Sequence, residues 1–194
     1  MHATIPQSYY NVSGGCFTDG WRVMTYDGTT KLVRDIRAGD LVVSNDSPTG
    51  YARVTCVVRL AIANTLCMIA PDGINGITAF HPVWLSSDNI QRNWKFPEQI
   101  TDKFIVLRKG EYMYDFVIDR GYSVCFIGGV SGDINVACLG HECKDNDVII
   151  HEYFGTHKII DDLKDHDEWN NGYITLESWQ FKRDSYNRVV KLEF

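Results

Sequence analysis

Short apolar and β-branched runs, separated by turn residues, recur along most of the chain. Extended runs flank Tyr26-Asp27-Gly28, where Asp-Gly accepts the positive φ values of a tight hairpin turn. Further runs follow about every 8 to 12 residues, a spacing typical of all-β folds. They cover residues 41–44, 51–63, 66–70, 77–85, 112–118, 124–127 and 135–139. The pattern predicts an all-β core rather than alternating strands and helices.

The pattern changes after the last of these runs. Apolar residues recur at helical spacing between Thr156, a suitable N-cap, and Asn171-Gly172. We therefore predict one amphipathic helix near residues 157–166, with its acidic face exposed to solvent. One further helical turn is expected at residues 97–99, because proline suits the first turn of a helix.

Composition and charge limit the possible partners. At 194 residues, the chain is long enough to bury a self-sufficient core as one domain, with or without an appendage. The net charge of −6 and the absence of a Lys/Arg cluster argue against nucleic acid and against an anionic membrane surface. No stretch approaches the roughly 20 apolar residues that span a bilayer. We therefore expect no membrane partner, and we expect a monomer.

The six cysteines do not suggest a disulfide framework. Cys56, Cys67 and Cys125 lie inside apolar strand-like runs, where a free thiol packs as a small hydrophobe. Residues 1–13 also lack the apolar centre of a signal peptide. Because disulfides persist mainly in oxidising compartments, we favour a reduced, cytoplasmic environment.

Four residues suggest nucleophilic chemistry when they are considered together. Cys16 follows Gly15 at the start of the strand series, and a thiol attacks only as the thiolate, with help from a base. Thr78 and His81 form a Thr-x-x-His sequence, and Asp115 lies in a later strand. Each signal alone has an ordinary explanation, such as a buried thiol or a core histidine. Their combination suits an N-to-S acyl shift, in which Cys16 attacks the Gly15 carbonyl and the peptide becomes a thioester.

Such a shift needs help because resonance stabilises the planar amide. The site must twist the bond, protonate its nitrogen, or do both. His81 is the natural proton donor near neutral pH. Thr78 could hydrogen-bond the same peptide and hold it bent, and Gly15 tolerates unusual dihedral angles.

Several segments, in the same order along the chain, resemble those of a known superfamily. The first set resembles signature blocks of the Hint (hedgehog/intein) superfamily: Gly15-Cys16-Phe17 and residues 35–42, 78–81 and 113–118. A second set is similar to the Vint family of hedgehog/intein-like domains: residues 77–83, 94–97, 139–142 and 151–156. The resemblance runs from about residue 16 to residue 176.

The resemblance implies both a fold and residue roles. The fold would be a pseudo-two-fold horseshoe of short strands with one or two short helices. The flank would be residues 1–15, the Hint core residues 16–140, and a C-terminal extension containing a helix, residues 141–194, would pack on the core. Cys16 would be the nucleophile, Thr78 and His81 would activate the scissile amide, and Asp115 would shuttle a proton or orient the thiol.

The chain departs from the intein pattern in ways that limit the reaction. Tyr122 stands where such inteins often have histidine, and no terminal His-Asn pair is present. His141 falls near the place of an intein's penultimate histidine, but Glu142 follows it, so a structural or Vint-specific role is favoured. We therefore predict a single-turnover, cysteine-dependent cleavage or transfer without full splicing. His141 and Tyr122 are accessory candidates.

Several points stay open at this stage. The substrate would be the chain's own N-terminal flanking polypeptide, and water, a thiol, an amine or a lipid alcohol could resolve the thioester. The alternative is a catalytically silent Hint-fold scaffold or binding module. No cofactor is expected, and Cys-x-x-His-x-Cys is not a usual zinc spacing, so we predict no metal. The residues on which a zinc site would depend are Cys138, His141, Cys143, His151 and His157.

Overall fold

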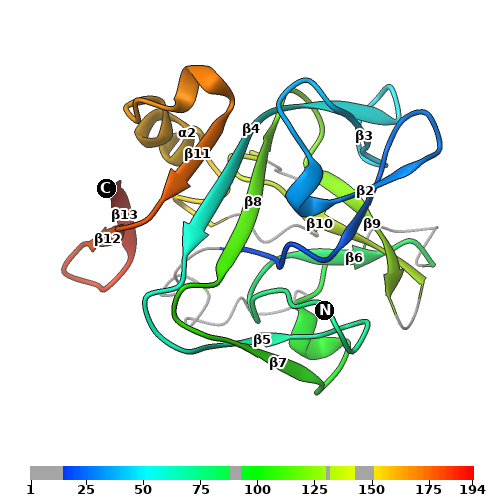
Figure 1. Cartoon of the computed structure of the whole chain (residues 1–194), viewed down its shortest axis with the longest axis horizontal. Coiled ribbons are helices and arrows are strands. Elements are labelled where there is room, and N and C mark those ends of the chain that lie inside the picture. The colour runs from blue at the N-terminus through cyan, green and yellow to red at the C-terminus, as the bar shows by residue number, and fades with distance from the viewer. Residues whose placement is uncertain (1–14, 88–92, 130–131, 143–150) are drawn as a thin grey trace.

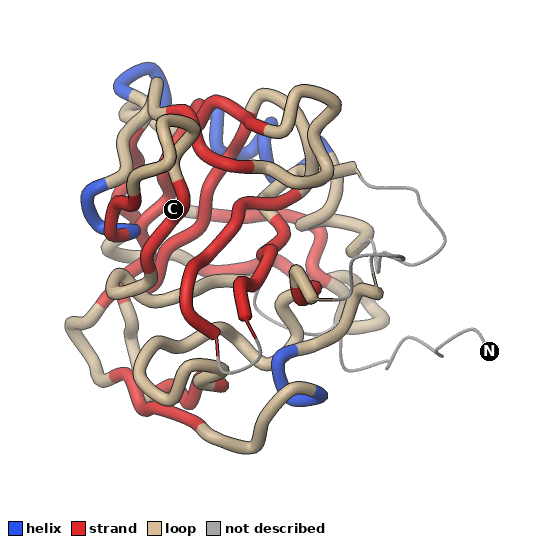
Figure 2. Tube along the Cα trace, turned by 90° about the vertical axis from the view of Figure 1, so that its right-hand side faces the viewer, coloured by secondary structure: helices blue, strands red, loops and turns tan. Residues whose placement is uncertain are grey.

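The computed structural model describes residues 15–87, 93–129, 132–142 and 151–194. Strands account for most of the regular structure, and the helical segments are short (Figures 1 and 2). The strands are β1 (Arg22–Met24), β2 (Thr30–Leu32), β3 (Leu41–Val43), β4 (Tyr51–Ala61), β5 (Leu66–Ile69), β6 (Val83–Leu85), β7 (Phe104–Leu107), β8 (Tyr112–Ile118), β9 (Ser123–Gly129), β10 (Gly132–Ala137), β11 (Tyr173–Leu176), β12 (Gln180–Arg183) and β13 (Val189–Glu193). The helices are η1 (Val33–Asp35), η2 (Pro97–Gln99), α2 (His157–Lys164) and η3 (Trp169–Asn171).

The long strand β4 organises the sheets. It pairs antiparallel with β8 along most of its length and antiparallel with β3 at its start, while β11 joins its other edge in parallel (Figure 1). A second sheet, within the described chain, has the order β2-β1-β9-β10-β6. Two ribbons, β5 with β7 and β12 with β13, complete the pairing. The predicted all-β fold is confirmed.

The pattern of burial along β4 shows that its side chains pack into two different apolar clusters. Its first half alternates between buried and exposed residues, as a strand with one solvated face should. From Cys56 to Val58 every side chain is buried, because both faces of the strand are covered there. Val57 packs with Phe116 in one apolar cluster, whereas Cys56 and Val58 belong to a second cluster. The β4–β8 pair therefore separates two cores.

The second core contains much of the C-terminal part of the chain. Ile159 and Leu163 of α2, Ile174 and Leu176 of β11 and Leu192 of β13 all pack in it. Tyr173 to Leu176 are hydrogen-bonded in register with Val57 to Leu60. Strand β11, which follows α2 in the chain, is thus part of the sheet built on β4.

The helix prediction is confirmed, with one difference in its surface. Helix α2 has the Thr156 side chain as N-cap acceptor for Lys158 N, and it is the one α-helix in the described residues. The acidic face was predicted to be exposed to solvent, but Asp162 on that face is only partly exposed. Its carboxylate accepts hydrogen bonds from the Tyr153 hydroxyl at 2.5 Å and from Leu192 N at 2.9 Å, which ties the helix to β13. The predicted turn at residues 97–99 is the 3-10 helix η2.

Several elements differ from the predicted runs. Within residues 77–85 only Val83–Leu85 is a named strand, because the chain turns at Thr78 to His81. The sequence pattern did not predict β7, β11, β12 and β13. No described helix has the length and apolar character needed to cross a membrane.

The position of α2 in the second core predicts how stability responds to truncation. Leu163 is fully buried, so Leu163→Ala should lower the free energy of unfolding by about 3 kcal/mol, through lost transfer energy and the cavity left behind. Urea denaturation measures this loss. Lys164→Ala in the same helix is the matched control and should change stability by less than about 0.5 kcal/mol. Equal effects of the two changes would contradict the packing.

Candidate active site

Consecutive residues at the start of the described chain face opposite cores. Cys16 packs in the second apolar cluster and Phe17 in the first. Backbone hydrogen bonds hold Phe17 to Tyr114 of β8, with N to O distances of 2.9 and 2.8 Å in the two directions. The peptide before Cys16 is therefore fixed by strand pairing as well as by packing.

Thr78 holds the backbone of Cys16 from two sides. Cys16 N donates to Thr78 Oγ1 at 3.0 Å, and Thr78 N donates to the Cys16 carbonyl at 2.9 Å. His81 N then donates to the Thr78 carbonyl at 3.0 Å, which closes a tight turn. This turn explains the Thr-x-x-His spacing, because it brings both side chains to the same peptide.

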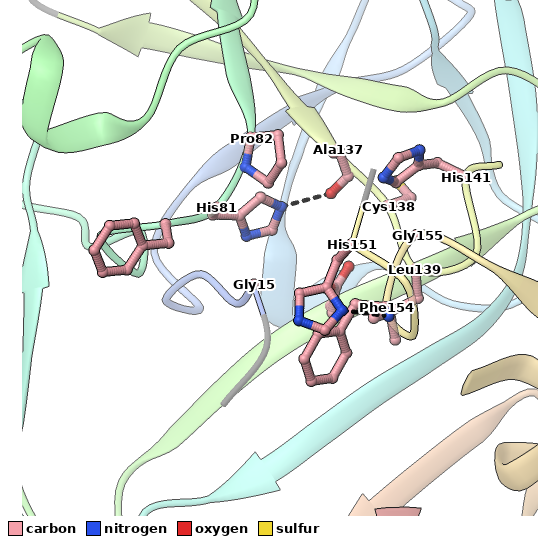
Figure 3. Close-up of a pocket in the computed structure, with 12 residues that line it drawn as sticks. Gly15, His81, Pro82, Ala137, Cys138, Leu139, His141, His151, Phe154 and Gly155 are labelled. Atoms are coloured by element: carbon pink, nitrogen blue, oxygen red, sulfur yellow. Dashed lines mark hydrogen bonds between the residues drawn. The ribbon is translucent and has the colours of Figure 1, made fainter. Parts of the chain in front are cut away.

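His81 lies directly against Gly15. A Cβ atom added at Gly15 would be only 2.6 Å from His81 Nδ1, so a side chain at this position would displace the ring. The other nitrogen, Nε2, lies 2.6 Å from the Ala137 carbonyl (Figure 3). A carbonyl oxygen can only accept, so Nε2 carries the proton of the neutral ring and Nδ1 presents a lone pair.

The electrostatics of His81 favour that neutral form. Burial lowers the pKa of His81 to about 4, and the Ala137 carbonyl and the Cys16 backbone oppose the shift only in part. Nδ1 is buried and has no hydrogen-bond partner at normal geometry. The ring is thus neutral at rest, and its protonated form is a stronger acid than an ordinary imidazolium.

Cys16 and Asp115 are buried together. Burial raises the pKa of the Cys16 thiol well above its usual value, and the nearby Asp115 carboxylate raises it further. Burial also raises the pKa of Asp115, against the backbone N–H groups of Phe116 and Leu139. Phe116 N donates to Asp115 Oδ1 at 2.6 Å and so fixes the carboxyl group. The thiol is therefore protonated in the resting site.

Two small cavities flank the Gly15–Cys16 peptide. The first lies on the histidine side, where His81, His141 and His151 line it beside Gly15 (Figure 3). Asp115 also lines it, and we call it the polar cavity because of these titratable side chains, which share its wall with apolar residues. The second reaches Cys16 and Asp115 but is otherwise apolar. Its walls include Leu163, Leu176 and Leu192 from the C-terminal segments. The polar cavity suits a water-sized reactant, while the apolar one shields the sulfur.

The two accessory candidates differ in position. His141 lines the polar cavity, and burial lowers its pKa to about 4, with His81 and His151 adding to the shift and Glu142 opposing it. Tyr122 does not line this cavity. It touches the site through its carbonyl, which accepts from Cys138 N at 2.9 Å. The structure therefore brings His141, but not the Tyr122 side chain, to the cavity beside Gly15.

Among the described residues, no group of three or more histidine, cysteine, aspartate or glutamate side chains is arranged so that it could hold a metal ion. Cys143, one of the residues considered for zinc, lies outside the described residues.

His151 reaches the site although sequence reasoning gave it no catalytic role. It is 2% exposed and lines the polar cavity. Its Nδ1 accepts from Tyr153 N at 3.1 Å and from Phe154 N at 3.2 Å. In the sequence, His151 is marked only by its place just before the turn at Tyr153–Gly155. Its role could not be inferred from that place, because it depends on the backbone N–H groups that bind the ring in the folded chain.

The all-β fold and the clamped Gly-Cys junction match those expected of a Hint-type domain, the class to which inteins belong. The family described as "Vint: Hint-domain" matches residues 15–191, nearly the whole chain. The chain therefore belongs to the Vint family of Hint domains.

Two solved structures are similar to this chain. An intein-like domain from Clostridium thermocellum has a TM-score of 0.47 at 15% identity, covering 64% of this chain and 99% of that domain. The gp41-1 intein has a TM-score of 0.41 at 18% identity, covering 63% of this chain and 98% of the intein. A search among curated proteins found no match.

The burial of His81 predicts a pH dependence of stability. Because its pKa falls from 6.5 to about 4 on folding, the unfolded chain binds a proton that the folded chain does not, and stability is lost as pH falls through this interval. The slope contributed by His81 is at most about 1.4 kcal/mol per pH unit. Urea denaturation between pH 7 and pH 5 should show a smaller loss for His81→Asn than for wild type. Parallel curves for the two proteins would contradict the assigned shift.

Proposed function

We propose that this domain converts the Gly15–Cys16 peptide into a thioester by an N-to-S acyl shift and so releases or transfers the polypeptide on its N-terminal side. The observation that carries this proposal is that Thr78 Oγ1 binds the Cys16 nitrogen while the His81 ring packs on Gly15. The two groups therefore lie against the two residues that the amide bond joins.

The proposed step balances with groups already in the site. The Cys16 sulfur forms a bond to the Gly15 carbonyl carbon, the bond from that carbon to the Cys16 nitrogen breaks, and the nitrogen gains a proton to become an amine. The reaction starts from the state in which the proton of the buried Asp115 carboxyl group has moved to His81 Nδ1. The Asp115 carboxylate then accepts the thiol proton, since it lies close enough for its charge to raise the pKa of the thiol. His81, protonated at Nδ1, delivers a proton to the departing nitrogen. Because its pKa is about 4, the protonated ring is acidic enough for this weakly basic atom.

The surroundings support cleavage or transfer rather than splicing. Thioester sulfur at Cys16 would face apolar walls on one side, which leaves the polar cavity as the approach for the second nucleophile. Water, a thiol and an amine all fit that description. His141 precedes Glu142 rather than asparagine, so no side-chain amide follows it to cyclise and release a C-terminal segment.

A silent scaffold remains the second candidate function. It is favoured by the burial of Cys16, which is 3% exposed and has a raised thiol pKa. Such a thiol is unreactive unless the neighbouring groups activate it. The two functions differ in whether thiol reagents cleave the chain.

We expect dithiothreitol or hydroxylamine to cleave the 194-residue chain between Gly15 and Cys16, because both intercept a thioester and leave ordinary amides intact. Intact-mass spectrometry should show a 15-residue peptide and the remaining 179 residues. Cys16→Ala should abolish the products, and Cys67→Ala, which removes an exposed thiol, should not. Equal stability of wild type and Cys16→Ala would leave the scaffold as the better account.

The roles assigned to His81 and Asp115 predict different losses. His81→Ala should slow thiol-induced cleavage by about 100-fold or more, the usual scale for a positioned general acid. Asp115→Asn should also slow cleavage but by a smaller factor, because the amide oxygen still accepts from Phe116 N while another base must take the thiol proton. Cleavage rates from quenched time courses measure both effects, and His157→Ala, a change on the exposed end of α2, is the control. Unchanged rates for His81→Ala would refute its role.

A further inference from the structure

The acyl shift, if it occurs as proposed above, requires a donor that the assigned residues do not supply. Attack on the Gly15 carbonyl places negative charge on its oxygen, and a fixed hydrogen-bond donor at that oxygen is a major source of catalysis. Thr78 Oγ1 lies on the nitrogen side of the peptide, where it accepts from Cys16. Neutral His81 directs its proton to Ala137 and presents a lone pair at Nδ1. A further donor is therefore needed.

Backbone hydrogen bonds determine which nitrogen of the His151 ring carries the proton. Nδ1 faces two N–H donors, those of Tyr153 and Phe154. A proton on Nδ1 would point at these hydrogens and break both bonds, so Nδ1 is the acceptor. In the neutral ring the proton must then be on Nε2, which is a donor.

The ring is also held firmly beside the scissile peptide. Gly155 N donates to the His151 carbonyl at 3.0 Å and closes the turn, and the Phe154 ring packs on the imidazole with centroids 4.6 Å apart. Figure 3 shows the Nδ1 side of His151 directed to Phe154 and the ring next to Gly15. His151 and Gly15 line the same cavity. A donor fixed in advance in this way needs no reorganisation during the reaction.

We propose that His151 is a further catalytic residue, whose Nε2–H donates a hydrogen bond to the Gly15 carbonyl oxygen and stabilises the oxyanion of the acyl shift. The proton stays on Nε2 throughout, so no bond of the imidazole is made or broken. Attack of the second nucleophile on the thioester places charge on the same oxygen. His151 therefore serves both steps, and its role rests on the proposed function.

Two substitutions separate catalysis from the structural role of the ring. His151→Asn places an amide oxygen near the position of Nδ1, so it keeps an acceptor for Tyr153 N and Phe154 N but removes the donor. His151→Gln extends its amide to the position of Nε2, so it keeps a donor toward the cavity but loses the acceptor. Thermal unfolding monitors the turn, and thiol-induced cleavage of the full chain monitors catalysis.

We expect His151→Asn to retain the wild-type melting temperature and to lose about 100-fold or more in cleavage rate, the scale for one oxyanion donor. His151→Gln should be less stable yet faster than His151→Asn. His157→Asn is the matched control at an exposed position. Nitrogen NMR of labelled histidine should show the Nε2–H tautomer in wild type.

Two negative outcomes are distinguishable. If wild type cleaves and His151→Asn stays within about threefold of it, the inference about His151 is wrong while the proposed function stands. A wild-type chain that is as stable to thiol reagents as Cys16→Ala overturns both. A ring protonated at Nδ1 overturns the inference whatever the cleavage rate.

Discussion

The pair of hydrogen bonds between Cys16 and Thr78 is the constraint on which the site depends. Cys16 and Thr78 are 62 positions apart in the sequence, yet Thr78 binds both the N–H and the carbonyl of Cys16. The hydrogen bond to Thr78 Oγ1 fixes the orientation of the Cys16 nitrogen. The turn from Thr78 to His81 fixes the position of the His81 ring, which packs on Gly15. Without this clamp, the strand pairing of Phe17 would still hold the backbone, but no group would act on the nitrogen of the scissile bond.

Burial is the second determinant of the chemistry, and it has opposite effects on the groups involved. It favours the neutral thiol of Cys16 and the protonated form of Asp115, while it favours the neutral rings of His81 and His141. The resting site thus contains potential reactants in their uncharged forms. A site that acted once on its own chain, as proposed above, would tolerate such a low concentration of the reactive state, because its substrate peptide would always be bound.

The sequence was sufficient for features that depend on local geometry. Thr78 and His81 were recognisable because a single turn links them, and the helix after Thr156 has a regular apolar spacing. Strand β12 has no such signal: of its residues only Phe181 is apolar, and its pairing with β13 decides its structure. Asp162 and His151 were misjudged or missed because their roles depend on contacts with Leu192 N and with the Tyr153 and Phe154 amides. Such contacts exist only after folding.

The apolar cavity that reaches Cys16 is lined by α2, β11 and β13, and this has a consequence for the order of events during biosynthesis. Ribosomes make Cys16 long before Leu163, Leu176 and Leu192, yet these three side chains form the apolar wall beside its sulfur. A nascent chain that still lacks them has Cys16 but not its dry enclosure. This apolar cavity is therefore complete only after translation of the C-terminal strands. The self-cleavage proposed above would then follow synthesis of the whole domain, and the upstream polypeptide would stay attached until that point.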